Sequence, residues 1–544
     1  MDFTMLLMSE ISPALRTLIE RTGLTEEFLA GINTPFAAQL DNMDDFIHTL
    51  HSYKNNEITI YPDFDMDGIT SGTILYAGLS QLGFNVHLSI PDYDSGHEFC
   101  ASDVDDIVNR FPHTTVILTC DSGVNSVEGI RYAQSKGLAV LVTDHHDQEV
   151  DCPADAMIDP CQRNSSYPLP GICGAAVAFL MISAYARTFS TGQEARFLNL
   201  LQLFAGIGTV SDVMPLIHDN RFLVKRSLNL TRELLTNPHA LQYLRADTSV
   251  HPAFLTAFEG YSQLLQELKV TIQQCDEQFY GYTLAPLFNA PRRVGTDISD
   301  AFTVFTCADR QQRRISMVRL IAANNKRKQA VKEYLNTLDD SYAPYIYITD
   351  APRGMLGLLA GKLMHDSNVP TAVVHVSEDG KRIEGSMRSP DYYPIIDMLN
   401  NRDGLEVVGH QGAGGVSGPL ESLVDALDGV AVPTDYEAEP ALIIGDETDD
   451  VAWWDQAALH EITRFLDSIA PFGKNFEYPI LDLLIPSGAD VIHLGSEKQH
   501  LKIQMSGCPP VLLWNTDEVP DSVRVRLCYN EFRGVKTLQM IGQN

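Results

Sequence analysis

Acidic and histidine side chains recur in the first 212 residues at positions that could converge on one ligand. They are Asp63, Asp65 and Asp67 in DFDMDG, Asp121 in DSG, Asp144, His145 and His146 in TDHH, and Asp212 in GTVSD. Most follow an apolar run, such as EITIY, TTVILTC or LAVLVT, that is typical of a buried strand. We therefore expect four strand ends to carry them.

The charge of such a cluster indicates its chemistry. In an open α/β sheet the carboxyl ends of the strands line the ligand crevice, so these side chains would meet at one edge. Several carboxylates brought together repel one another unless cations neutralise them. Oxygen-rich ligation with one or two imidazoles suits Mn²⁺ or Mg²⁺ better than Zn²⁺. The combined pattern predicts a divalent metal centre, although each piece alone is also explained by a helix N-cap or a surface histidine pair.

The elements that would position this cluster alternate between strand and helix from residue 58 to about 215, which predicts a parallel α/β sheet. Short β-rich runs in the final part of the chain predict a small barrel resembling an OB fold, and residues 434–460 are interpreted as a linker or an exposed face. We expect five segments: N-terminal helices at 1–55, the α/β domain at 56–220, a helical region with a long connecting helix at 221–340, a second α/β domain at 341–433, and an acidic linker with the barrel at 434–544.

Composition narrows the class of protein. The net charge of −32, from 39 basic and 71 acidic residues, argues against a generic binder of duplex nucleic acid, but it is compatible with a narrow single-strand channel. No apolar run approaches the ~20 residues that a membrane helix needs, so no membrane partner is expected. Nine scattered cysteines form no CxxC pair. We therefore expect a cytoplasmic protein.

The order DFDMDG, DSG, TDHH and GTVSD resembles the four signature motifs of the DHH phosphoesterase superfamily. The resemblance implies hydrolysis of phosphodiesters with two metal ions, Mn²⁺ or Mg²⁺. It implies the metal ligands Asp63, Asp65, Asp67, Asp121, His145 and Asp212, with Asp121 as the bridging ligand. Besides Asp121 and His145 it implies two catalytic residues: Asp144, which would orient the neighbouring imidazole, and His146, which would face the substrate phosphate.

Further segments resemble the RecJ family within that superfamily, over roughly residues 10–510. They are NAPRRVG (289–295), EGSMRS (384–389), VGHQGAGG (408–415) and PFGKNFEYP (471–479). The resemblance implies a DHHA1 domain whose substrate-binding residues are Arg293, Ser386, Arg388, Ser389, Gly409, His410, Gly412 and Gly414. Its glycine run would cradle a phosphate with backbone amides. The chain departs from the family pattern at Tyr61, at Val408 and in PDYDSGHEF (91–99).

The RecJ resemblance implies an exonuclease that releases mononucleotides from the 5′ end of single-stranded DNA. Candidate protein partners are a single-strand-binding protein and a helicase. Two alternatives stay open: a phosphodiesterase for dinucleotides or short oligonucleotides, and a non-catalytic DNA-binding scaffold. The basic residues of 310–332 form either a solvated helix face or part of the nucleic-acid path. Lys502, Trp514 and their neighbours form either a single-strand platform or part of the barrel core.

Overall fold

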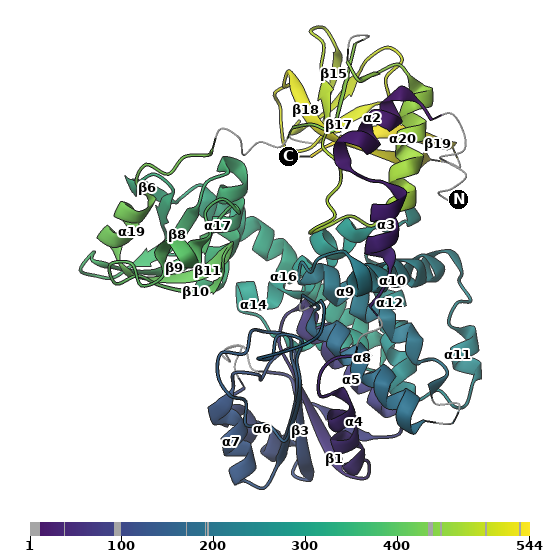
Figure 1. The fold of residues 1–544 in the computed structure, drawn as a ribbon, viewed down its shortest axis with the longest axis vertical. Coiled ribbons are helices and arrows are strands. Elements are labelled where there is room, and N and C mark those ends of the chain that lie inside the picture. Colours follow the sequence, from purple (N-terminus) through teal and green to yellow (C-terminus); the bar gives the residue numbers. More distant parts are fainter. Residues whose placement is uncertain are drawn as a thin grey trace. The chain divides into compact units, whose positions relative to one another are not determined.

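The computed structural model describes residues 11–36, 39–91, 99–169, 171–190, 192, 195–433, 439–446, 449–495, 498–532 and 535–543. The chain divides into two compact units (Figure 1). The first comprises Met1–Ala285, Phe302–Arg313 and Glu439–Asn544, and the second comprises Pro286–Ala301 and Arg314–Ala438. No helix in these described ranges is long and apolar enough to span a bilayer.

A five-stranded parallel sheet in the order β2-β1-β3-β4-β5 is the framework of the first unit. Its strands are β1 (Glu57–Pro62), β2 (Asn85–Leu88), β3 (Thr114–Cys120), β4 (Ala139–Thr143) and β5 (Ala156–Ile158). The central strands are buried along most of their length, as expected for a sheet covered on both faces. The predicted parallel α/β sheet is confirmed. The strand after β1 lies on one side of it, and all later strands lie on its other side. This change in the order of the strands occurs between β1 and β3, and open α/β sheets bind ligands at such a point.

Helices cover both faces of this sheet. On one face α6 (Ala101–Arg110) and α7 (Val127–Ser135) enclose a core that includes Tyr61 and Phe99, whose rings are 5.1 Å apart. On the other face α5 (Met66–Gln81) and α8 (Gly174–Phe189) contact each other and the strands. The remaining helices of this layer are α4 (Met43–Ser52), η2 (Leu198–Leu201) and α9 (Gln202–Ser211).

A series of helices follows this domain. Its members are α10 (His218–Thr236), α11 (Gln242–Ala246), α12 (Pro252–Glu267), η3 (Ile272–Gln274), η4 (Phe279–Leu284), α13 (Ala285–Phe288), α14 (Ala290–Val294), α15 (Ser299–Thr306) and the long α16 (Arg310–Leu335). One basic side chain of α16 is structural: Arg313 is buried and donates to Gln263 Oε1 at 3.1 Å and to the Cys307 carbonyl at 2.9 Å. Its burial removes Arg313 from any nucleic-acid path.

The C-terminal strands belong to the first unit and form the predicted barrel. They are β14 (Leu481–Leu484), β15 (Asp490–Leu494), β16 (His500–Gln504), β17 (Val511–Leu513), β18 (Ser522–Phe532) and β19 (Val535–Gly542). They pair in the order β14-β18-β19-β17-β16-β15, with β17 and β19 parallel. In this order β14 and β15, which are consecutive along the chain, lie at opposite ends of the six strands.

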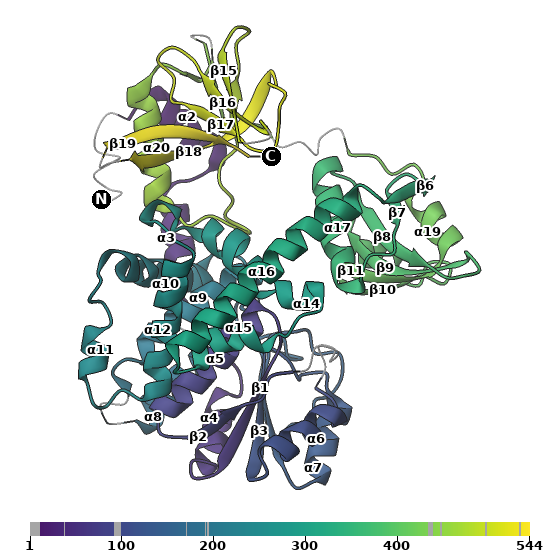
Figure 2. The same cartoon turned by 180° about the vertical axis from the view of Figure 1, so that it is seen from behind.

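The interpretation of residues 434–460 as a linker is wrong for most of the described part. β12 (Leu442–Gly445) pairs with β14 and with β13 (Val451–Ala452), and α20 (Gln456–Ile469) packs on the barrel core. The N-terminal helices α2 (Pro13–Thr22) and α3 (Glu26–Asn33) contribute to that same core (Figure 2). Apolar residues such as Leu442 and Ile444 were therefore a stronger signal than the acidic composition around them.

The second unit contains a mixed six-stranded sheet in the order β10-β11-β9-β8-β7-β6. Its strands are β6 (Asp339–Ala343), β7 (Ile346–Ile348), β8 (Thr371–Val376), β9 (Arg382–Arg388), β10 (Glu406–His410) and β11 (Ala413–Pro419). Its helices, besides the end of α16, are α17 (Arg353–Ser367), α18 (Ile395–Leu399) and α19 (Leu420–Leu427). The predicted second α/β domain is confirmed as an α/β fold.

Candidate active site

Three loops at the carboxyl edge of the parallel sheet carry most of the predicted cluster. Asp63 follows β1, Asp121 follows β3, and Asp144 and His145 follow β4. The Asp63 amide donates to the Cys120 carbonyl and the Asp121 amide to the Thr143 carbonyl, so the strand ends are tied together. Asp65 caps α5 by accepting from the amides of Asp67 and Gly68. Asp212 joins the cluster from the end of helix α9, so its prediction as a strand-end residue is wrong.

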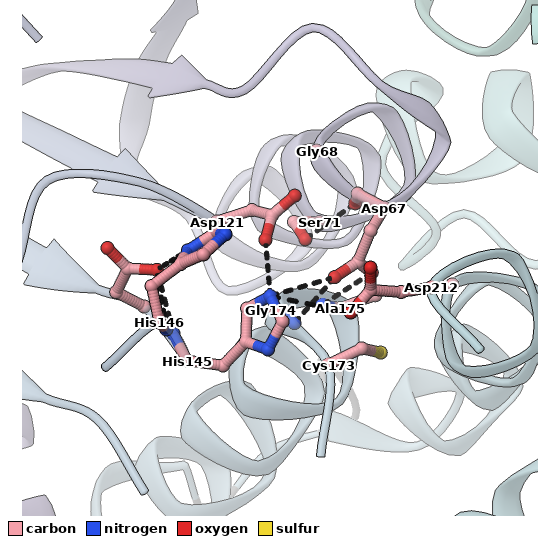
Figure 3. Close-up of polar contacts among 12 residues, drawn as sticks. Asp67, Gly68, Ser71, Asp121, His145, His146, Cys173, Gly174, Ala175 and Asp212 are labelled. Atoms are coloured by element: carbon pink, nitrogen blue, oxygen red, sulfur yellow. Dashed lines mark hydrogen bonds and ion pairs between the residues drawn. The ribbon is translucent and has the colours of Figure 1, made fainter. Parts of the chain in front are cut away.

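His145 lies at the centre of this cluster (Figure 3). Its Nε2 is 3.0 Å from Asp121 Oδ1, 3.6 Å from Asp212 Oδ2 and 3.8 Å from Asp67 Oδ2. Asp67 and Asp121 are almost fully buried. One imidazole therefore faces three carboxylates that come from different loops and helices.

Burial makes these carboxylates hard to ionise. Burial and then the charge of Asp65 raise the pKa of Asp67 to about 7, although the α8 amides of Gly174 and Ala175 donate to it at 2.7 and 3.1 Å. Burial, followed by the charges of Asp67, Asp65 and Asp63, raises the pKa of Asp121 well above its ordinary value. Burial and the charge of Asp67 do the same to the pKa of Asp212. The cluster therefore lacks positive charge.

The donor set fits divalent cations. Ligand atoms within 4.8 Å of one another form three groups: Asp63, Asp65 and Asp121; Asp67, His145 and Asp212; and Asp121, His145 and His146. Asp121 Oδ1 and Asp212 Oδ2 are buried without a hydrogen-bond partner among the described residues. Carboxylate oxygens with one or two imidazoles are ligands that suit Mn²⁺ or Mg²⁺. The first two groups share no residue, so each could hold one ion, and the third group shares Asp121 with the first and His145 with the second.

The environment of Asp144 differs from that of the other buried carboxylates. Its Oδ1 accepts from the amide of His145 and from Nδ1 of His146, the latter at 2.7 Å, and its Oδ2 accepts from the Val124 amide. Burial alone would raise the pKa of Asp144, but the His146 contact and the nearby imidazoles lower it. Conversely, burial would lower the pKa of His146, but Asp144 raises it to about 10. Asp144 therefore holds the His146 ring directly, and it touches His145 through the backbone amide.

Glycines allow the helices to approach these carboxylates, and sequence reasoning did not single them out. A Cβ on Gly174 would lie 2.7 Å from Asp121 Oδ1, and one on Gly208 would lie 2.4 Å from Asp67 Oδ1. The segment GICGAAVAFL showed a Gly-rich helix entry, but nothing in it indicated that the entry contacts Asp121. Of the departures, Tyr61 is buried against Phe99, and residues 92–98 of PDYDSGHEF lie outside the described residues.

A second set of predicted residues meets on one face of the second unit's sheet. In the strand register Arg388 pairs with Ala413, which pairs with His410 on its other side, and Ser386 pairs with Gly415, which pairs with Val408. Laterally paired residues point to the same face of a sheet, so Ser386, Arg388 and His410 share one surface. Val408 is 75% exposed on that surface.

Arg388 lies in a notch of helix α17. A Cβ on Gly357 would lie 2.6 Å from Arg388 Nη2, so a larger residue there would force this guanidinium to shift. Its Nη1 donates to Ser386 Oγ at 2.9 Å and to the Met387 carbonyl at 2.8 Å. Within the described ranges no carboxylate lies within 4.0 Å of it. Burial lowers the pKa of Arg388, and the charge of Arg293, which donates to the Gly354 carbonyl, lowers it further.

Two expectations for this second set need correction. The glycine run forms the paired strands β10 and β11 rather than a loop, so the β11 amides lie between two strands and pair within the sheet. Gly409 and Gly414 instead permit close strand packing, since a Cβ on Gly409 would lie 2.6 Å from the Ala413 carbonyl oxygen. Ser389 is buried and donates to the Tyr393 carbonyl at 2.6 Å, and Gly412 lies in the turn that accepts from the Ser389 amide.

Comparison with known proteins agrees with this geometry. Residues 57–207 match the family described as "DHH family, N-terminal domain". The single-stranded-DNA-specific exonuclease RecJ of Salmonella typhimurium is 27% identical over 595 residues, which cover 99% of this chain and 97% of that protein. RecJ of Bacillus subtilis is 26% identical over 467 residues, 83% of this chain and 55% of that protein. The crystal structure of Thermus thermophilus RecJ in complex with Mn²⁺ has a TM-score of 0.73 and 20% identity, covering 98% of this chain and 76% of that one. The segment that matches the DHH family model contains the parallel sheet whose edge carries the carboxylate cluster.

Proposed function

We propose that this protein is a metal-dependent exonuclease of single-stranded DNA. The observation that carries the proposal is the convergence of buried, mutually repelling carboxylates on His145 at the carboxyl edge of the parallel sheet. The full-length similarity to proteins named single-stranded-DNA-specific exonucleases supports the choice of substrate. Release of mononucleotides from a 5′ end is part of the proposal.

Asp63, Asp65, Asp67, Asp121, His145 and Asp212 would hold two divalent cations, with Asp121 between them. Bound cations of this kind supply a nucleophile from water near neutral pH and neutralise charge on the reacting phosphate. Asp144 fixes the ring of His146 through Nδ1, which leaves Nε2 as the atom that can donate to a phosphate oxygen. His146 would therefore act on the substrate rather than as a metal ligand.

The arginine face of the second unit would bind the 5′ phosphate. Arg388 has no carboxylate partner in the described structure and is held next to a second cation, Arg293. A terminal phosphate is dianionic near neutral pH, and a guanidinium can bind it through two parallel hydrogen bonds. Ser386 and His410 share the Arg388 face and would contact the same group, whereas Ser389, Gly409, Gly412 and Gly414 would act by shaping the strands around it.

The barrel would bind the strand further from the cleaved bond. His500, Lys502 and the 41%-exposed Trp514 are on the strands β16 and β17 or next to them, and the His500 and Trp514 rings are 5.0 Å apart. Such a basic surface with an exposed aromatic ring suits single-stranded nucleic acid. Tyr529 is a weaker candidate because its hydroxyl bonds to His460 Nδ1 at 2.9 Å and its ring stacks on His460.

We also propose a setting for this activity. All nine cysteines are free, which suits a reducing compartment such as the cytoplasm. A single-strand-binding protein or a helicase, either of which presents single-stranded DNA, would be a suitable partner.

The test is digestion of end-labelled single-stranded and blunt duplex DNA by the full chain with Mn²⁺. We expect the single strand to be degraded much faster, mononucleotides to be released from the 5′ end, and activity to vanish in excess EDTA. Binding of DNA without cleavage would support the scaffold instead, and cleavage restricted to dinucleotides would support a small-substrate phosphodiesterase. Full activity in EDTA would contradict the metal-dependent mechanism.

A further inference from the structure

A cavity of about 640 Å³ lies within the first unit, away from the carboxylate cluster. Helix α10, the segment around η3, helix α20 and the β18–β19 hairpin line it. None of the proposed metal ligands contributes to its wall. Its volume is in the range of cavities that hold a small organic ligand.

Three cations face this cavity without an ion pair. Lys225 Nζ bonds to Asn33 Oδ1 at 2.5 Å, Arg232 Nη2 donates to the Cys275 carbonyl at 2.9 Å, and Lys536 Nζ lies 4.2 Å from the centroid of the Tyr529 ring. In the described ranges none of them has a carboxylate oxygen within 4.0 Å. In a chain with 71 acidic and 39 basic residues, cations that lack an acidic partner are well placed to bind an external anion.

The carboxylates of the wall are mostly engaged. Glu277 Oε1 lies 2.8 Å and Asp276 Oδ2 3.9 Å from Arg526 Nη2, and Glu531 accepts from Gln273 at 3.3 Å. Asp467 has no ion pair within 4.0 Å among the described residues. Burial raises the pKa of Asp467, and the nearby charges of Lys536, Arg526 and Arg232 only partly offset this. The wall thus offers donors for an anion and, at Asp467, an acceptor for a neutral N–H group.

Apolar and aromatic side chains complete the wall. Leu228, Ile272, Phe472 and Tyr478 all line the cavity. Such a surface can cover the plane of a heterocyclic base. A ligand that is complementary to all of these side chains has a phosphate at one end, a flat apolar body, and ring or amino N–H donors.

We propose that this cavity binds a nucleoside monophosphate, with Arg232 and Lys536 contacting the phosphate and Asp467 accepting a hydrogen bond from the base. The site shares no residue with the proposed metal centre or with the arginine face. Its occupancy is therefore independent of the proposed nuclease activity.

The experiment is calorimetric titration of the full chain with deoxyadenosine 5′-monophosphate in excess EDTA. The Arg388→Ala variant serves as the background, because it removes the other face proposed to bind a phosphate. We expect one binding site, which Lys536→Ala and Arg232→Gln each weaken about tenfold through loss of a charged hydrogen bond. Deoxyadenosine and inorganic phosphate should each bind at least about tenfold more weakly, because each lacks one half of the ligand.

Arg524→Ala is the matched control. Arg524 is on β18 two residues from Arg526, but it does not line the cavity, so its removal should leave the affinity within about twofold. Lys536 is exposed, so Lys536→Ala tests the site even where Arg232→Gln unfolds the protein. Lys536→Arg should retain binding. No binding at about 1 mM ligand, equal weakening by Arg524→Ala, or equal affinity for inorganic phosphate would overturn the proposal.

Discussion

The carboxylate cluster of the first unit and the arginine face of the second unit are opposite in sign but alike in one respect. Each holds like charges close together where burial makes those charges unfavourable. Asp67, Asp121 and Asp212 have raised pKa values, and Arg388 has a lowered pKa next to Arg293. Buried like charges are unfavourable unless a ligand of the opposite sign joins them. The comparison therefore indicates a cation site and an anion site.

The two regions also differ in how they are held. The carboxylates are fixed by strand-end hydrogen bonds, by the α8 amides and by the close approach of Gly174 and Gly208. The arginine face depends on two hydrogen bonds from one guanidinium and on the space left by Gly357. We therefore expect substitutions in the first region to abolish activity, and substitutions in the second to alter the choice of strand end.

The largest effect is expected for Asp121→Asn. Because Asp121 is common to two of the candidate ligand groups, we expect the rate on single-stranded DNA to fall by about a thousandfold or more. The same substitution removes a charge from a repelling cluster, so the melting temperature in EDTA should rise. Asp105→Asn is the control, because Asp105 is on the surface of α6 and pairs with Lys136. Retention of more than about a tenth of the rate would show that Asp121 does not bridge.

A smaller effect is expected for Arg388→Ala. The wild type should cut a 5′-phosphorylated strand about tenfold faster than a 5′-hydroxyl strand, since one charged hydrogen-bonding group is worth about that factor. The variant should cut both strands at similar, low rates. The ratio of the two initial rates is the measurement, and the 5′-hydroxyl strand serves as an internal control. Equal rates in the wild type, or digestion from the 3′ end, would contradict the assignment of the arginine face.

The smallest effect is expected for Gly357→Ala. The added Cβ would lie 2.6 Å from Arg388 Nη2, so the guanidinium must shift and part of the 5′-phosphate preference should be lost. Gly361→Ala, one turn further along α17, is matched to it because a Cβ there would lie 3.9 Å from Arg388 Cγ. Replacing a helix-interior glycine by alanine usually stabilises by about 0.5–1 kcal/mol, so Gly361→Ala should raise the melting temperature and keep the preference. Identical 5′-phosphate preferences in Gly357→Ala and Gly361→Ala would contradict the role of Gly357 in positioning the Arg388 guanidinium.

Much of the carboxylate cluster was predictable because it follows from strand ends. Asp63, Asp121 and Asp144 come directly after apolar runs, and parallel strands must bring such ends to one edge. Asp212 was expected at a strand end, which is wrong, since GIGTVS is helical and its apolar residues do not distinguish a buried helix from a strand. The π-helical segment η4 and the strands β2 and β5 had no clear signal either.

The second region was harder to read from the sequence. GHQGAGG resembled a phosphate-binding loop of the family, but here small residues allow three strands to pack closely. Gly357 gave no signal, because its role depends on an arginine 31 positions later in the chain, on the strand β9 that α17 contacts. Likewise β12 and β13 could not be predicted from the sequence, because they lie in an acidic segment. Only their pairing with each other and with β14 shows that they are strands.

The proposed nuclease activity depends most directly on the carboxylate cluster being a two-cation site. The decisive measurement is calorimetric titration of the metal-free full chain with Mn²⁺, together with the single-strand cleavage rate at each point. We expect two ions per chain in the wild type, cleavage that rises as the second ion binds, and loss of at least one ion in Asp121→Asn but none in Asp105→Asn. Cleavage without bound Mn²⁺, or Mn²⁺ binding that is unchanged by Asp121→Asn, would contradict the account.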